Sequence, residues 1–172
     1  MAEDNNPTET NTAEDSSFLY IRGIYVKDIS FESPNAPRIF ASNDFNLNMD
    51  MQVRVGSEKV DENLIEVIVE IALHAKSNEQ TAYVVEIQQA GLFNMGGYNS
   101  WDQLRWMTHV FCPNMLFPYA RAEIARLIIQ GGFPPYHLEP INFDAMFKDQ
   151  LEELSKQDQE NKQARQVEQG EQ

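Results

Sequence analysis

The sequence predicts an α+β fold with an antiparallel sheet, because strand-type segments come first and helical segments follow. Residues 18–93 contain four stretches rich in β-branched and aromatic residues, and the apolar periodicity becomes helical after Gly96 and Gly97. Strands that are followed by helices, rather than alternating with them, are typical of α+β domains. The 172 residues fit one domain flanked by two polar segments.

The first two strands are expected on either side of a proline-broken connection. Residues 18–31, FLYIRGIYVKDISF, alternate imperfectly but contain the residue types that favour strands. Pro34 and Pro37 interrupt the chain after them, since each proline removes a backbone donor and restricts the residue before it. In residues 46–55 apolar and polar residues alternate over nine positions, which predicts a half-buried strand.

Residues 64–75 and 82–93 are predicted to be two further strands joined by a hairpin-length loop at residues 76–80. Side chains of the last strand should alternate between two faces of the sheet. One face carries Val84, Glu86 and Gln88, and the other carries Tyr83, Val85, Ile87 and Gln89. The second face is the one that we expect to be buried.

A first helix is expected around an apolar stripe that ends before residue 131. The stripe consists of Ala120, Ile124, Leu127 and Ile128, which recur at helical spacing. Two glycines and two prolines at residues 131–135 end the pattern. Asn114 is a plausible N-cap of this helix, and Pro118 marks either its start or a kink between two helical pieces.

A second helix should begin after Asn142, which can act as its N-cap. Its apolar face is formed by Phe143, Met146, Phe147, Leu151 and Leu154. Residues 1–17 and 155–172 have too little apolar surface to offset the entropy lost on ordering. We therefore expect a disordered acidic arm at 1–17, a folded domain at 18–154 and a polar flexible tail at 155–172.

Composition excludes several classes of partner. The chain contains 27 acidic and 13 basic residues, for a formal net charge of −14, which disfavours binding to nucleic acid or to an anionic membrane and favours a basic protein partner. Its one cysteine cannot form an internal disulfide, which points to a reducing compartment. The acidic N-terminal segment does not resemble a secretory signal, and no apolar run approaches about 18 residues. A cytoplasmic location without membrane insertion is expected.

No catalytic residue, metal site or cofactor site is predicted. The three histidines are spread over different elements, without metal-ligand spacing. His109 is three residues from Cys112, but the Cys-Pro junction bends the chain and no orienting acid is evident, so a packed thiol is expected. Glu66 and Glu70 share a strand face and are interpreted as an ordinary solvated row rather than an acid/base pair.

Four sequence blocks resemble the SecB family of protein-export chaperones. They are KDISFESPNAP at residues 27–37, VVEIQQAGLF at 84–93, CPNMLFPYAR at 112–121 and PINFDAMF at 140–147. Their order and spacing match the family over about residues 22–150. The resemblance implies a cytosolic, ATP-independent holdase that keeps secretory precursors unfolded and delivers them to the SecA motor. It also implies a four-stranded antiparallel sheet with two main helices, assembled as a homotetramer, a dimer of dimers.

The resemblance assigns three groups of residues. The surface that receives the basic, zinc-bearing C-terminal segment of SecA falls on Asp28, Glu32, Val84 and Glu86. Positions that support the tetramer are Val85, Ile87, Gln89, Tyr119, Ile124, Leu127 and Ile128. The expected lining of the groove for unfolded precursors is Phe40, Phe45, Met49, Met51, Phe143, Phe147 and Leu151. Flexible methionines suit such an adaptable surface.

Other functions remain open at this level. A SecB-like chaperone dedicated to one client, such as an antitoxin, would keep the fold but could lose the SecA surface. A small-ligand carrier could use a cleft between the sheet and the helices. A purely structural assembly protein would bind neither unfolded chains nor a small ligand.

Two features depart from the family pattern. The acidic arm is longer than is usual in the family, and the tail is less acidic than tails that add a second SecA contact.

Overall fold

A computed structural model describes residues 17–41 and 46–170 of the chain, with side chains up to Gln157. The predicted arm at residues 1–17, apart from Ser17, and the predicted groove residue Phe45 lie outside this description. Four strands form one antiparallel sheet in the order β1-β4-β3-β2, and the helices follow them in the chain. The predicted α+β class and four-stranded antiparallel sheet are confirmed.

The strands are longer than the patterns that predicted them. They are β1 (Phe18–Glu32), β2 (Asn48–Asp61), β3 (Leu64–Ser77) and β4 (Gln80–Gly96). The turn between β3 and β4 is correspondingly shorter than the predicted loop, since Ser77 already pairs with Gln80. Asn78 and Glu79 make this two-residue turn with φ angles of 48° and 62°, the positive values that a tight hairpin of the favoured twist requires.

The helical half begins earlier than predicted. Its elements are α1 (Trp101–Trp106), the π-helical turn η2 (Met107–Phe111) and α2 (Cys112–Gln130), which follow one another without a break; α3 (Phe143–Gly170) comes after a connection. Ser100 caps the start of α1, because its hydroxyl oxygen accepts a hydrogen bond from the Gln103 amide at 3.2 Å. A short 3-10 turn, η1 (Arg38–Ala41), lies between β1 and β2.

The prediction that Asn114 caps a helix was wrong. Asn114 lies inside α2, and its side-chain amide donates to the Val110 carbonyl oxygen at 2.8 Å. Such bonds to the preceding turn let asparagine sit within a helix. Pro118 also lies inside α2 and is not its start. Pro113 has no backbone N–H to donate to a carbonyl of the preceding turn. That preceding turn is η2, which has the wider π-helical geometry.

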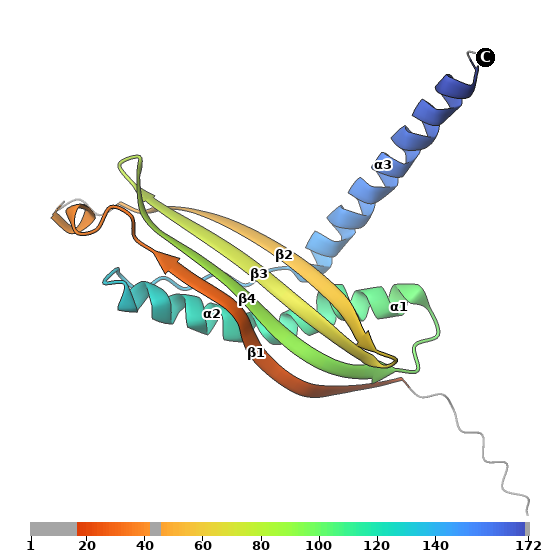
Figure 1. Ribbon diagram of the computed structural model, residues 1–172, viewed down its shortest axis with the longest axis horizontal. Helices are drawn as coiled ribbons and strands as arrows, with labels where there is room; N and C mark the ends of the chain where they lie inside the picture. The colour runs from red at the N-terminus through yellow and green to blue at the C-terminus, as the bar shows by residue number, and fades with distance from the viewer. Residues whose placement is uncertain (1–16, 42–45, 171–172) are drawn as a thin grey trace, which may run out of the picture.

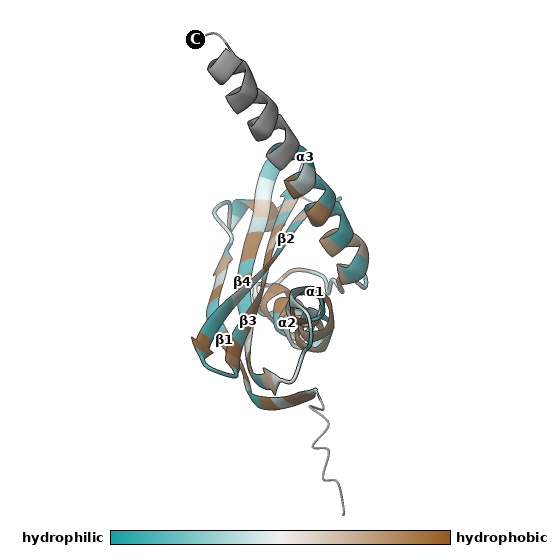
Figure 2. Ribbon diagram, turned by 90° about the vertical axis from the view of Figure 1, so that its right-hand side faces the viewer, coloured by the Kyte–Doolittle hydropathy of each residue, from teal (hydrophilic) through white to brown (hydrophobic). Residues whose placement is uncertain are grey.

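One face of the sheet packs on α2 and forms the core (Figure 1). Figure 2 shows α2 nearly end-on beside this face. Tyr83, Val85, Ile87 and Gln89 are each at most 2% exposed, which confirms the predicted buried face of β4. Val67, Val69, Ile71 and Leu73 of β3 and Leu116, Ile124 and Ile128 of α2 complete its centre. None of the described helices packs on the opposite face of the sheet, here called the outer face.

The predicted cap of the last helix is confirmed, since the Asn142 side-chain oxygen accepts from the Ala145 amide at 3.0 Å. The helix itself continues to Gly170, beyond the predicted domain boundary at residue 155, and points away from the sheet (Figure 1). Its last turns are rich in Gln, Glu, Lys and Arg, which form helices readily without an apolar face. No helix among the described residues combines the length and apolar character needed to cross a membrane.

Candidate functional site

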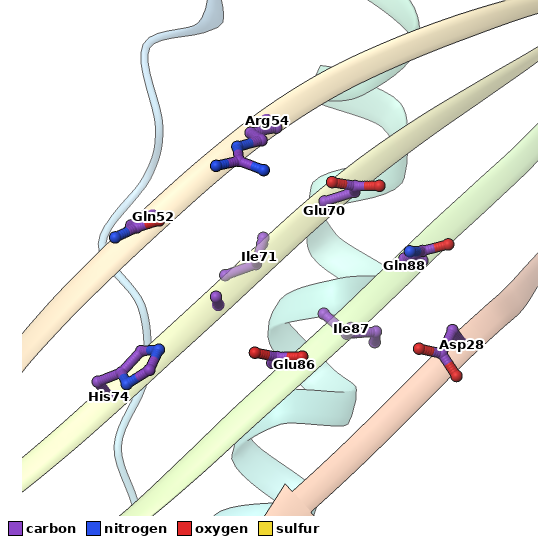
Figure 3. A pocket seen from close by; sticks show the side chains of 10 residues that line it. Asp28, Gln52, Arg54, Glu70, Ile71, His74, Glu86, Ile87 and Gln88 are labelled. Carbon is purple, nitrogen blue, oxygen red and sulfur yellow. The ribbon is translucent and has the colours of Figure 1, made fainter.

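The outer face of the sheet carries a shallow polar hollow of about 230 Å³ at its centre. All four strands contribute to it, as Figure 3 shows. Its polar lining includes Asp28 of β1, Gln52 and Arg54 of β2, Glu70 of β3, and Glu86 and Gln88 of β4. Sheet pairing builds this site, because side chains at every second position of each strand reach the same face.

The strand register brings the four residues predicted to bind SecA together on this face. Glu32 pairs directly with Val84, and Asp28 pairs with Gln88, two positions along β4 from Glu86. Asp28, Glu32 and Glu86 are exposed, and Val84 is half-buried. The three carboxylates therefore form an open acidic cluster, which suits a basic partner.

Two charged residues beside this cluster, Glu70 and Arg54, were not assigned to it by sequence reasoning. Glu70 lies between Gln88 on β4 and Arg54 on β2, its partners in the two ladders. Both line the same hollow as Glu86. The alternation of residues 64–75 had placed Glu70 on a solvated face, but only the pairing of β3 with β4 brings it next to the acidic cluster.

Glu66 corrects the interpretation of a solvated glutamate row. It is 6% exposed, and both of its carboxylate oxygens are bonded: the Tyr25 hydroxyl donates to Oε1 at 2.5 Å, and the Lys27 ammonium donates to Oε2 at 2.6 Å. The Lys27 bond, followed by the Tyr25 bond, lowers the pKa of Glu66. The same contact with Glu66 is the largest cause that raises the pKa of Tyr25 to about 12. A buried carboxylate needs such partners to remain charged.

The residues predicted to line the client groove do not share one exposure. Phe40 and Met51 are 43% and 39% exposed, and Met49 and Leu151 are partly buried. Phe143 and Phe147 are 1% and 8% exposed and face the chain's own core. They hold the start of α3, since Phe143 meets Phe117 edge-on at 6.1 Å and the Phe147 ring lies 5.3 Å from His109.

An aromatic cluster joins the end of β1 to the connection between β1 and β2, here called the crossover, and to the segment after α2. Phe133 is at its centre, with its ring 4.7 Å from Tyr83 and 4.9 Å from Phe40. Phe31 stacks on Tyr83 at 5.9 Å and lies 6.3 Å from Phe133. Within this cluster, the buried ring of Phe133 packs against the exposed ring of Phe40. Tyr83 also donates a hydrogen bond to the Met49 sulfur at 3.7 Å, which ties β2 to the cluster.

Most of the residues predicted to support the tetramer lie inside a single chain. Val85, Ile87, Gln89, Ile124 and Ile128 are at most 2% exposed and pack between the sheet and α2. Leu127 is partly buried, and Tyr119 is 51% exposed on the far side of α2. Among these positions Tyr119 is the one that another molecule can contact most directly.

The remaining candidates for chemistry are ordinary packed groups. Cys112 is fully buried, and burial raises the pKa of its thiol to about 12, so it does not supply a thiolate nucleophile. His109 Nδ1 lies 3.1 Å from the Arg105 carbonyl oxygen, and burial lowers the pKa of its ring. Within the described ranges, no three His, Cys, Asp or Glu side chains are grouped so that they could hold a metal ion.

A second hollow, of about 460 Å³, lies where α1 meets the end of the sheet. Its lining includes the apolar side chains of Ile65, Met95 and Leu104 and the 80% exposed ring of Trp101. This is the place where a cleft between sheet and helices could accept a compact ligand.

The family model and the sequence relatives agree on one family, and a solved structure shares the fold. The family model described as "Preprotein translocase subunit SecB" matches residues 12–154. The protein-export protein SecB of Nitrosococcus oceani is 39% identical over 154 residues, covering 89% of this chain and 93% of the relative. That of Chromohalobacter salexigens is 45% identical over 151 residues, covering 86% and 91%. A solved SecB-like chaperone of Mycobacterium tuberculosis, in complex with a ChAD peptide from an antitoxin, matches with a TM-score of 0.60 and 20% identity over 72% of this chain and 90% of that one.

Proposed function

The chain belongs to the SecB family of protein-export chaperones, and from that premise we propose that it is an ATP-independent cytosolic holdase that delivers unfolded precursors to SecA. The observation that supports delivery most directly is the open acidic cluster of Asp28, Glu32 and Glu86 on the outer face. The role is one of binding, without catalysis or a cofactor.

The acidic cluster suits the basic, zinc-bearing C-terminal segment of SecA. Its three carboxylates lie in an exposed, shallow region, where charge complementarity increases the association rate and selects the partner. Val84 adds an apolar contact beside them. Glu70 enlarges the acidic area, while Arg54 marks its β2 side with a positive charge.

Client binding requires several shallow apolar anchors rather than one deep pocket. Ordering an unfolded chain costs about 1 to 2 kcal/mol per residue. A large aromatic side chain that buries about 200 Å² returns roughly 5 kcal/mol at about 25 cal/mol/Å². One anchor therefore offsets the ordering of only a few residues. The exposed Phe40 and Met51 are suitable members of a dispersed set.

The outward face of α2 supports assembly into a tetramer. Besides its buried stripe, α2 carries apolar side chains on the opposite side, at Tyr119, Ala122 and Ile129. Tyr119 and Ile129 are 51% and 54% exposed. A helix that is apolar on both sides buries both when a second layer covers it. We propose that α2 lies between dimers, with the buried residues of the interface group holding the helix in place.

Replacing Tyr119 with Asp is expected to shift the tetramer toward dimers, because a charge would then have to be buried between the α2 helices. Sedimentation velocity over a range of protein concentrations measures this shift. Tyr119→Phe keeps the ring and should keep the tetramer. An unchanged tetramer in Tyr119→Asp would show that α2 does not form the contact between dimers.

The test of the proposed function is the refolding of a denatured, slow-folding precursor with and without this protein. We expect arrested refolding at about one tetramer per precursor, without ATP, and no binding to the native precursor. Unimpeded refolding would contradict the holdase. Saturable binding of a compact ligand in the 460 Å³ hollow would instead support the small-ligand carrier.

A chaperone dedicated to an antitoxin is less well supported. The relatives at 39% and 45% identity are named for protein export. The chaperone with the antitoxin peptide is 20% identical, so its likeness concerns the fold alone. The acidic cluster on the outer face, which a dedicated chaperone could lose, is present.

A further inference from the structure

The edge strand β1 contains a bulge directly beside the acidic cluster. Tyr25 pairs with Ala90 and Asp28 pairs with Gln88, so β1 has two residues, Val26 and Lys27, where β4 has only Gln89. A bulge of this kind places an extra residue in one strand and re-aims the side chains next to it. The side chains of Tyr25, Lys27 and Asp28 consequently all lie on the outer face of the sheet.

The bulge is held from both faces of the sheet. On the outer face Glu66, from β3, reaches across β4 to the Tyr25 hydroxyl and the Lys27 ammonium at 2.5 and 2.6 Å. Ala90 of β4 pairs with Tyr25 on one side and with Ile68 of β3 on the other, two positions along β3 from Glu66. On the inner face the Gln89 amide donates to the Tyr25 carbonyl oxygen at 2.9 Å.

The contact with Glu66 also determines where the charge of Lys27 goes. Lys27 precedes Asp28 directly, so a free ammonium on this face could pair with the carboxylates of the acidic cluster. Its side chain is 42% exposed, whereas that of Glu66 is 8% exposed. The ion pair thus places the ammonium against a largely buried carboxylate, away from Asp28.

We propose that Glu66 is a positioning residue of the SecA-docking surface: it sequesters Lys27 and fixes the bulge, which leaves Asp28 and Glu86 available to a basic partner. This inference rests on the proposed function. It assigns a docking role to residues outside the four that the family resemblance named, and it explains why a glutamate is buried in the wet face of a sheet.

Binding of the SecA C-terminal segment by three full-length proteins tests the inference. In Glu66→Gln the amide can still accept from Tyr25, but Lys27 loses its ionic partner. We expect this variant to bind about tenfold more weakly, with a larger deficit at low salt, where the released ammonium is least screened. The double variant Lys27→Gln/Glu66→Gln removes the competing cation and keeps polar groups at both positions, so its affinity should return to within about twofold of the wild type.

Arrest of precursor refolding is measured on the same samples and should be unchanged in both variants. Wild-type affinity in Glu66→Gln would overturn the inference. Persistent weakness of the double variant would also overturn it, because Glu66 would then act through the fold alone, as would a joint loss of SecA binding and refolding arrest. A wild-type protein that does not bind the segment would overturn the docking function itself, and the inference with it.

Discussion

Reversing the charge of Glu86 with Lys is expected to abolish binding to SecA while leaving client binding intact. Glu86 is exposed on the central strand β4, opposite Ser30 of β1 and Ala72 of β3. The change replaces an attraction for a basic segment with a repulsion, and unfavourable like-charge contacts cost several kcal/mol at an interface. Since 1.4 kcal/mol is a factor of ten, the affinity should fall by about 100-fold or more.

The measurement is titration of the SecA C-terminal segment, with refolding arrest followed in parallel. Glu62→Lys is the matched control, because it makes the same charge change at an exposed position on the β2–β3 turn, at the far end of the sheet. The control should bind SecA nearly as the wild type does. Unchanged affinity in Glu86→Lys would contradict the assignment of the outer face as the docking surface.

The largest loss of stability is expected from Phe133→Ala. Phe133 is 4% exposed and contacts Tyr83 and Phe40, with Phe31 slightly further away. Truncation of a buried phenylalanine removes its transfer free energy and leaves a cavity, which together cost about 3 to 5 kcal/mol. Because the cluster joins the sheet to the crossover, the variant should also loosen the support of Phe40. Urea unfolding at fixed protein concentration measures the change.

Phe40→Ala is the companion to that experiment, because Phe40 belongs to the same cluster but is 43% exposed. We expect a smaller loss of stability and a clear weakening of refolding arrest. The two variants therefore separate the buried support of the proposed client groove from its proposed exposed surface. A Phe133→Ala protein as stable as Phe40→Ala would show that the aromatic cluster is not a unit of the fold.

The alternating strand patterns predicted the sheet well, whereas the sequence signals for helix ends predicted the helix boundaries less well. Alternation in β4 correctly separated Val84 and Glu86 from Val85 and Ile87. A strand has a period of two, and α2 covers only one face of the sheet. The start of the first helix was misplaced at Asn114, because capping residues also bond to a preceding helical turn. Nothing in the local pattern distinguishes those two uses of one side chain.

For the candidate site, the sequence by itself determined the residue types. It also determined the family resemblance, through four blocks that match the family in order and spacing. It also determined which face of β4 is wet. Tertiary structure alone decided which wet residues meet. Glu66 was expected to be solvated because it shares a strand face with Glu70, yet it is buried by Tyr25 and Lys27, which are 41 and 39 residues away in the chain.

The same distinction holds for the groove and the interface residues. Aromatic and aliphatic residues at helical spacing were assigned to binding surfaces, and composition alone does not tell which of them the chain covers itself. Phe143 and Phe147 pack inward while Tyr119 stays exposed. Periodicity determines which side chains share a face of an element, whereas burial depends on what packs against that face, and in a sheet this is set by pairings between distant segments.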